Sequence, residues 1–334
     1  MAKYRNRHKE AQRSLLRVSE SLAAFIRHEN LVYWLEEGKY SAIVPQKDDY
    51  RLNILRGTPK NLGALLYRDF WDKEIPIVLT SGTLSAAGSF EHIKRKTGLA
   101  FLPSGRLAET TKPSPFNHRE NALLYISEKT PFPNTGNPDH IDTVADEVER
   151  LIGASHGHAA VLFTSYKAMD LVYQRIDARQ LPYPVLRLDR GGAAVIEQFK
   201  RSGNGVLFAS GALWEGIDIP GDILSMLIIV RLPFAVPDPV SEWERTLYAD
   251  IDEYKAKVIV PEMLVKLKQG FGRLIRTESD TGIVAILDSR ANEAGAYRRR
   301  VLAALPRCRI TSNIVDIDSF MLSKKLPAYF SQAA

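Results

Sequence analysis

Apolar positions recur along the second half of the chain in two alternating patterns. From about residue 141 onward, apolar residues spaced three and four apart predict helices, and short continuous apolar runs predict buried strands. The predicted order is helix 141–152, strand 159–163, helix 167–176, strand 185–188, helix 192–201, strand 205–209, strand 223–230, helix 261–275 and strand 282–287. Such alternation is typical of βαβ units. We therefore predict an α/β fold with a parallel sheet flanked by helices.

The first hundred residues show shorter and less regular patterns. Residues 9–29 place apolar positions at helical spacing among many basic ones, which predicts a basic amphipathic helix. Such a helix either contacts nucleic acid or covers a core with one face and meets water with the other. Further strands are predicted at 31–36, 41–45, 51–56 and in the run IPIVLT, 75–80. Six prolines between 103 and 138 then indicate a stiff connector.

Composition and charge narrow the class of protein. The 334 residues, 45% of them hydrophobic, suffice for about two domains with buried cores. A net charge of +6 favours a polyanionic partner such as nucleic acid without requiring one. The polar N-terminus and the lack of a long apolar run predict a cytoplasmic protein with no membrane partner. The single cysteine, Cys308, excludes an intrachain disulfide and a four-cysteine iron–sulfur cluster in this chain, and the histidines predict no metal site.

The stretch QGFGRLIR, 269–276, carries the clearest chemical signal. On a helix, Gln269, Arg273 and Arg276 share one face. Two guanidinium groups beside an amide can bracket a phosphate, because each guanidinium presents a planar fork of donors. This pattern suggests a nucleoside triphosphate as the ligand. The alternative is a basic helix face that only meets water.

A glycine-rich loop, SGALWEGIDIPGD, follows the apolar run at 205–209 and carries Glu215 and Asp218. In an open α/β sheet, ligands bind beyond the carboxyl ends of the strands, and Gly211 and Gly216 let the backbone approach a ligand closely. The two carboxylates can hold ribose, metal-bound water or the arginines. Alternatively, Asp218 only caps a turn.

Together these segments resemble the C-terminal motor half of superfamily 2 DNA helicases of the DinG and XPD type. The matches in chain order are LTSGTL (79–84, motif III), LFTSY (162–166, motif IV), WEGIDIPGD (214–222, motif V) and QGFGRLIR (motif VI). RLPFAVPDPV (231–240) resembles a Pro-rich segment of the DinG branch, and SPF (114–116) and LDSRA (287–291) are weaker matches. The resemblance implies a RecA-like lobe in an ATP-driven motor that moves 5′ to 3′ on DNA.

The resemblance also assigns roles around the nucleotide. Arg273 and Arg276 would be arginine fingers that neutralise charge on the transferred γ-phosphoryl group, and Gln269 would sense that phosphate. Glu215 and Asp218 would link the nucleotide state to closure of the lobes. The motif V loop would contribute Gly211 and Gly216.

Motifs III and IV would connect the nucleotide to the strand. By resemblance, Ser81 and Thr83 would couple the nucleotide site to the DNA groove through hydrogen bonds, or form a simple turn. Thr164, Ser165 and Tyr166 would hold phosphates of single-stranded DNA without reading bases. A hydroxyl of this segment can equally be the N-cap of the following helix.

Two parts of the family pattern are missing. No G-x-x-x-x-G-K-[ST] string occurs, so the chain has no candidate for a Walker A loop. DEVE, 146–149, lies in a predicted helix, whereas a Walker B acid follows an apolar strand, so we interpret DEVE as a solvated helix face. ATP and Mg²⁺ would then be held mainly by a Walker A and Walker B lobe supplied in cis or in trans. This chain alone is expected not to hydrolyse ATP.

One further motif points elsewhere. GASHG, 153–157, fits the G-x-S-x-G pattern of a hydrolase nucleophile. That nucleophile needs a strand that runs into a helix, whereas here a helix runs into a strand. We therefore do not interpret Ser155 as a nucleophile.

The resemblance divides the chain and sets the functional prediction. Residues 1–30 would be the basic helix at the end of an arch-like insertion, 31–102 the C-terminal part of a first RecA-like lobe, 103–140 a connector and 141–334 the second RecA-like lobe. We predict the C-terminal motor portion of an ATP-dependent DNA helicase. One alternative is a catalytically inactive nucleic-acid-binding or regulatory fragment. Another is a nucleotide-binding α/β protein that does not bind DNA.

Overall fold

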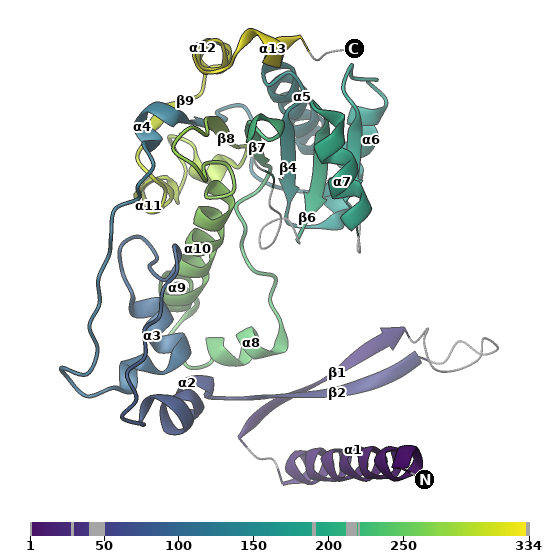
Figure 1. Cartoon of the computed structure of the whole chain (residues 1–334), viewed down its shortest axis with the longest axis vertical. Coiled ribbons are helices and arrows are strands. Elements are labelled where there is room, and N and C mark those ends of the chain that lie inside the picture. The colour runs from purple at the N-terminus through teal and green to yellow at the C-terminus, as the bar shows by residue number, and fades with distance from the viewer. Residues whose placement is uncertain are drawn as a thin grey trace. The chain divides into compact units, whose positions relative to one another are not determined.

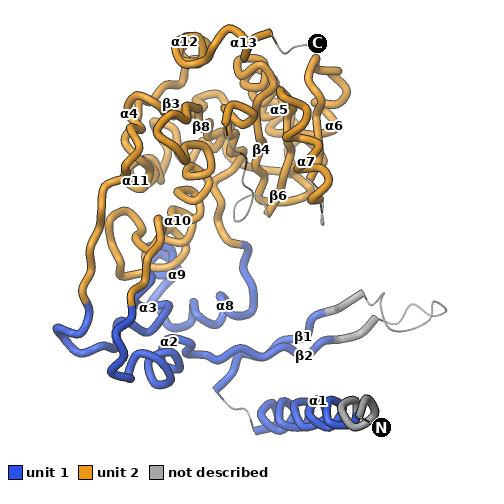
Figure 2. Tube along the Cα trace, in the orientation of Figure 1, with its two compact units in different colours: residues 1–77, 93–107, 236–256 blue, residues 78–92, 108–235, 257–334 orange. Residues whose placement is uncertain are grey.

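The computed structural model describes residues 2–27, 30–39, 51–188, 192–211, 219 and 221–331. The chain divides into two compact units, which Figure 2 colours separately. Unit 1 consists of residues 1–77, 93–107 and 236–256, and unit 2 of residues 78–92, 108–235 and 257–334.

Unit 2 is built on a seven-stranded parallel sheet with the order β5-β6-β4-β7-β8-β3-β9 (Figure 1). Its strands are β3 (Ala122–Ile126), β4 (Ala159–Phe163), β5 (Val185–Leu188), β6 (Val206–Ser210), β7 (Met226–Ile229), β8 (Gly282–Ile286) and β9 (Arg309–Thr311). Its helices are α4 (His118–Asn121), α5 (Pro138–Ala154), α6 (Tyr166–Asp177), α7 (Ala193–Ser202), α10 (Val260–Phe271), α11 (Arg298–Ala304), α12 (Ile314–Lys324) and α13 (Pro327–Phe330). The predicted α/β fold class is confirmed.

Both faces of this sheet are buried. Along β4, Ala160 and Leu162 belong to a core that also contains residues of α7, α10 and α11. Val161 and Phe163 point to the opposite core, to which α5, α6 and α12 contribute. Strands that are buried on both faces read as continuous apolar runs, which explains why they were predicted from the sequence. Helices therefore cover both faces of the sheet. The edge at which the strands end is left open for a functional site.

One central strand was missed. β3 lies inside the segment that was predicted to be only a connector, and it pairs with β8 on one side and β9 on the other. All five of its residues are buried. Because prolines lie on both sides of this apolar run, the segment was predicted to be a connector and not a strand. Its position became evident only from its neighbours, which are far away in the chain.

One predicted strand does not form. The run at 75–80 is extended but pairs with no strand among the described residues, so the prediction of a strand there was wrong. Val78 in this run is 89% exposed. A strand requires a hydrogen-bonded neighbour, and the described chain offers none here. The strand predicted at 41–45 lies outside the described residues.

Unit 1 combines a hairpin with short helices. Its elements are α1 (Ala2–Ile26), β1 (Leu31–Lys39), β2 (Arg51–Pro59), α2 (Leu62–Leu66), a π-helical turn (Tyr67–Trp71), α8 (Pro239–Arg245) and α9 (Ile251–Tyr254), together with most of α3 (Glu91–Thr97). β1 and β2 are antiparallel. The indole Nε1 of Trp71 donates a hydrogen bond to the carbonyl oxygen of Thr97 at 2.6 Å. Gly98 follows with φ +80°, and a Cβ at this position would lie 1.9 Å from the carbonyl oxygen of Gly63, so only glycine fits there.

Candidate functional site

The carboxyl edge of the parallel sheet gathers the predicted motifs of unit 2. β4 ends at Phe163, directly before Thr164, and β6 ends at Ser210, directly before Gly211. Because all strands run in one direction, these ends lie at the same edge, where α/β sheets bind ligands. Gly211 has φ +68°, in the left-handed region that favours glycine. Its place at the start of the motif V loop therefore has a backbone reason.

The other residues predicted in this loop cannot be placed. Glu215, Gly216 and Asp218 lie outside the described residues. Their roles stay predictions.

Motifs III and VI meet within unit 2. Nε2 of Gln269 donates to Oγ1 of Thr83 at 3.5 Å, across 186 positions of the chain. Oγ of Ser81 lies 3.2 Å from Oγ1 of Thr83 and also accepts a hydrogen bond from the Thr83 amide at 3.2 Å. The contact to Gln269 is long for a hydrogen bond and therefore weak. It nevertheless places both hydroxyls of motif III beside the amide of motif VI, a contact that the sequence did not predict.

The arginines of motif VI are not on a helix with Gln269, and this prediction was wrong. α10 ends at Phe271, and the next residue, Gly272, is its C-cap. Glycine is a poor helix former, and here two glycines flank the last helical residue. Arg273 and Arg276 therefore lie in the turn that follows the helix. Local hydrogen bonds of that turn, and not helical spacing, position Arg276.

Hydrogen bonds fix that turn. Oδ2 of Asp280 accepts from the amides of Arg276 at 2.9 Å and Thr277 at 2.8 Å. Nε of Arg276 donates to the carbonyl oxygen of Arg273 at 3.1 Å. Burial lowers the pKa of Arg276, while the carboxylate of Asp280 opposes that shift. Nε of Arg273 is buried and has no hydrogen-bond partner among the described residues.

Motif IV occupies the start of α6. Ser165 is the N-cap of this helix, and its Oγ accepts from the amide of Ala168 at 3.2 Å. Tyr166 is the first helical residue and is exposed. The capping role that the sequence left open for this segment is thus observed for Ser165. A capping hydroxyl can still donate its own hydrogen to a ligand.

A buried ion pair beside the sheet was not recognised as part of the site. Asp288, just after β8, is fully buried, and its Oδ2 accepts from Nη2 of Arg290 at 2.6 Å and from the amide of Leu232 at 2.8 Å. The guanidinium of Arg290 lies over the ring of Phe234, 4.6 Å from its centroid. The pair therefore fixes the segment after β7 to the segment after β8. The string LDSRA, 287–291, contains both residues of this ion pair, but in the sequence it was only a weak match to the family.

The acidic string DEVE belongs to α5, as predicted, but it is not a solvated face throughout. Glu147 is buried and accepts hydrogen bonds from the hydroxyl of Tyr125 and from Nη1 of Arg150. The carboxylate can be buried because β3 supplies the tyrosine, and β3 had not been predicted. Ser155 is likewise buried at the end of α5, where its hydroxyl donates to the carbonyl oxygen of Leu151 at 3.0 Å, which agrees with a structural role.

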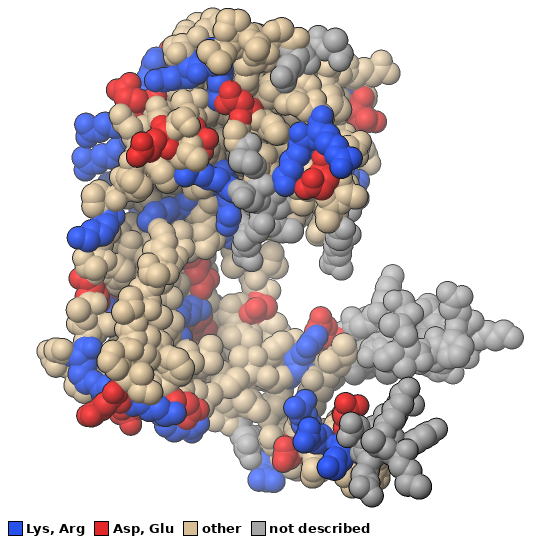
Figure 3. All heavy atoms as spheres, viewed as in Figure 1, with Lys and Arg blue, Asp and Glu red and all other residues tan. Residues whose placement is uncertain are grey.

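Charge is mixed over the visible surface. Figure 3 shows lysine and arginine side chains interspersed with aspartate and glutamate on the face that it presents. The net charge of +6 is thus not collected into one patch on this face. Recognition of an anion therefore depends on particular side chains more than on the net charge of the chain.

Comparisons with known proteins identify the class. Residues 148–308 match the helicase C-terminal domain family. The chain is 32% identical over 268 residues to the 3′-5′ exonuclease DinG of Bacillus subtilis. This match covers 76% of this chain and 28% of that protein. It is 30% identical over 304 residues to the ATP-dependent helicase DinG of Mycobacterium tuberculosis. This match covers 90% of this chain and 44% of that protein. A solved XPD helicase matches with a TM-score of 0.56 at 19% identity, over 77% of this chain and 46% of that one.

These findings confirm the resemblance drawn from the motifs. The chain carries a helicase C-terminal domain and corresponds to the C-terminal half of DinG/XPD-like helicases. The likeness to XPD shows that unit 2 has the RecA-like fold. The chain spans between 28% and 44% of the length of the two curated relatives named above.

None of the helices in the described part of the chain is both long and apolar enough to span a membrane. Nor do the described residues contain three or more histidine, cysteine, aspartate or glutamate side chains grouped so that they could hold a metal ion.

Proposed function

We propose that this chain supplies the C-terminal motor portion of an ATP-dependent DNA helicase. The observation that supports this most is the meeting of Thr83 and Gln269, with Arg273 four positions further on. Nε of Arg273 is buried without a partner among the described residues, and a buried polar atom of this kind calls for one. A phosphate oxygen is a suitable acceptor for a guanidinium N–H.

In this proposal ATP and Mg²⁺ bind between unit 2 and a Walker A and Walker B lobe, supplied in cis or in trans. Arg273 and Arg276 neutralise charge on the transferred γ-phosphoryl group, and an arginine finger contributes about 10³ to 10⁵ in rate. Gln269 contacts the γ-phosphate, and its hydrogen bond to Thr83, which in turn contacts Ser81, couples the presence of that phosphate to motif III. The lobe that cradles the phosphates is needed for hydrolysis, so the chain alone is inactive.

The strand of DNA would lie against motif IV. Thr164, Ser165 and Tyr166 offer hydroxyl groups at the carboxyl edge of the sheet, which can hold phosphates without choosing a sequence. By family resemblance the motor moves 5′ to 3′ on single-stranded DNA in the cytoplasm.

The run at 75–80 supports the need for a partner lobe. It has the composition of a strand, is extended, and leaves Val78 89% exposed with no strand beside it among the described residues. Exposed apolar side chains of this kind are typical of a surface that meets another protein surface. The proposed neighbour is the sheet of the first motor lobe.

The test is ATP hydrolysis by the purified chain, with and without oligo(dT), before and after addition of a separately produced Walker A and Walker B lobe. We expect no turnover by the chain alone and DNA-stimulated turnover in the mixture. Arg276→Ala should lower that turnover by about 10³ or more and leave DNA binding intact. Arg307→Gln removes an exposed arginine of unit 2 and is the matched control. Hydrolysis by the chain alone would contradict the missing lobe, and equal loss of binding and turnover would contradict the finger role.

A second function is favoured by the absence of a Walker A string from the sequence. The chain would then be a catalytically inactive module that binds nucleic acid or regulates a partner. This function predicts salt-dependent DNA binding with no turnover in any mixture. The same experiment therefore separates the two.

A further inference from the structure

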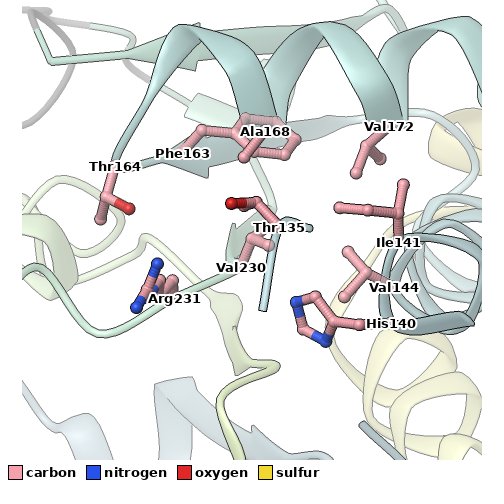
Figure 4. A pocket seen from close by; sticks show the side chains of 10 residues that line it. All are labelled: Thr135, His140, Ile141, Val144, Phe163, Thr164, Ala168, Val172, Val230 and Arg231. Atoms are coloured by element: carbon pink, nitrogen blue, oxygen red, sulfur yellow. The ribbon is translucent and has the colours of Figure 1, made fainter. Parts of the chain in front are cut away.

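A pocket in unit 2 lies where β4 and β7 end and the first turns of α5 and α6 begin (Figure 4). Its inner wall is apolar and includes Phe163 from β4. Its polar lining consists of Thr135, His140, Thr164 and Arg231, which come from three segments of the chain: the start of α5, the end of β4 and the end of β7. Thr164 belongs to motif IV, and Arg231 opens the Pro-rich segment RLPFAVPDPV, whereas the sequence had singled out neither Thr135 nor His140.

His140 is the buried polar group of this pocket. The residue is 4% exposed, and its Nδ1 has no hydrogen-bond partner among the described residues. Burial lowers the pKa of its imidazole, and the positive charge of Arg231 lowers it further. The ring is therefore neutral at pH 7, and a neutral imidazole retains one N–H donor. A buried polar atom without a partner calls for one, and a ligand in the pocket can provide it for Nδ1 of His140.

Arg231 brings a positive charge to the pocket, and no described residue forms an ion pair with it. It makes no hydrogen bond or ion pair with the described residues, although Asp288 acts on it electrostatically. The carboxylate of Asp288 already accepts from Arg290 and from the amide of Leu232. Two arginines thus share one carboxylate, and the second guanidinium is available for an anion.

Two helix N-termini face the same pocket. His140 lies in the first turn of α5, and Ala168, which also lines the pocket, lies in the first turn of α6. The N-terminus of a helix carries a partial positive charge and favours anions. Helix dipoles and a half-buried guanidinium therefore act in the same direction. Together with the N–H of His140 and the hydroxyl of Thr164 they form a site of the kind that binds an oxyanion.

We propose that His140, Thr164 and Arg231 hold one phosphate group of the bound DNA strand. This inference rests on the proposed function, because it adds to the motif IV contact two residues that lie outside the motif. Arg231 supplies the charge, while His140 and Thr164 supply directed donors. The pocket contacts no base edge, so it contributes affinity without sequence choice.

The first test is the salt dependence of binding of fluorescein-labelled oligo(dT) to the whole chain, measured by anisotropy between 50 and 200 mM NaCl. The slope of log K against log salt is negative, and loss of one phosphate contact to a single strand makes it less steep by about 0.7. We expect this change for Arg231→Gln and no change for Arg307→Gln, which removes an exposed charge elsewhere in unit 2. Thr164→Val, which keeps the shape of the side chain, should weaken binding several-fold at constant salt. Equal slopes for the two arginine variants would overturn the proposal.

The second test asks which phosphate the pocket takes. Inorganic phosphate is titrated against the wild-type chain and Arg231→Gln while the imidazole resonances of His140 are followed by NMR, with His140→Asn used for assignment. We expect the His140 signals of the wild type to shift with phosphate, the shift to be lost in Arg231→Gln, and oligo(dT) to prevent it.

The outcomes of these two tests are separable from failure of the proposed function. A phosphate response that oligo(dT) does not prevent would mean a site for a free anion or nucleotide, which overturns the assignment to DNA. No response in any sample would overturn the pocket as an anion site, even if the chain binds DNA elsewhere. Loss of ATP turnover in the reconstituted motor has no bearing on either readout.

Discussion

The two units differ in how completely they bury their apolar residues. In unit 2, every residue of β3, β4, β6, β7 and β8 is buried, and helices cover both faces of the sheet. In unit 1, α1 leaves apolar side chains in water, with Leu16 61% and Ile26 72% exposed. The comparison teaches that unit 2 closes its own core, whereas unit 1 presents apolar surface of the kind that usually meets another surface.

Removal of the buried carboxylate of unit 2 should have the largest effect. Asp288→Ala leaves Arg290 without its partner and the amide of Leu232 without an acceptor. Breaking a buried pair in this way costs about 3–5 kcal/mol of unfolding free energy. Urea denaturation followed by circular dichroism measures it, and the exposed Asp318→Ala is the control, for which we expect at most about 0.5 kcal/mol. Equal midpoints for the two variants would show that the ion pair does not hold the sheet edge together.

The same leucine truncation should act differently in the two units. Leu162→Ala in β4 removes a fully buried side chain and should cost about 2–5 kcal/mol. Leu16→Ala in α1 removes an exposed side chain and should change stability by about 0.5 kcal/mol or less. Both variants are compared by thermal unfolding. A large loss for Leu16→Ala would mean that α1 is packed in the isolated chain, which would remove the contrast between the units.

Acid should weaken unit 2 through His158. This ring is buried, stacks on Tyr329 with centroids 4.0 Å apart, and has its pKa lowered by burial. The unfolded ring titrates near its ordinary pKa of about 6.5, so below that pH the unfolded chain binds a proton that the folded chain does not. Stability therefore falls as pH falls through this value, by at most about 1.4 kcal/mol per pH unit for one proton.

His158→Gln should flatten this dependence between pH 7 and pH 5. His118 and His140 have pKa values lowered in the same direction by burial, so part of the slope should remain. His8→Gln, at an exposed position of α1, is the control for the substitution itself. Urea midpoints measured at each pH give the comparison, and a slope equal to that of the wild type would exclude His158 as a source.

The smallest effect is expected at motif IV, where one residue has two roles. Ser165→Ala removes the N-cap of α6 and should cost about 1 kcal/mol of stability along with some affinity for oligo(dT). Ser165→Asp keeps a good capping side chain, so it should restore stability while its charge repels a phosphate and weakens binding further. If oligo(dT) binds both variants as tightly as the wild type, Ser165 is only a cap.

The sequence alone predicted most of the parallel sheet, because its strands are continuous apolar runs between helices of clear period. The same periodicity failed where a segment depends on distant neighbours. β3 was hidden among prolines, and the run at 75–80 has strand composition but no neighbour to pair with in the described chain. Both errors concern the same physical fact, that a strand is completed only by hydrogen bonds to another strand.

The α/β order of the elements, the succession of helicase motifs and the lack of a Walker A string follow from the sequence alone. Each of these features is local, because every helix, strand and motif is recognised from a short stretch of adjacent residues. Only the packing of distant segments decided that β3 joins the sheet beside β8, that Thr83 contacts Gln269, and that His140 and Arg231 line one pocket. Those features arise from residues far apart in the chain, which only packing and hydrogen bonding bring together.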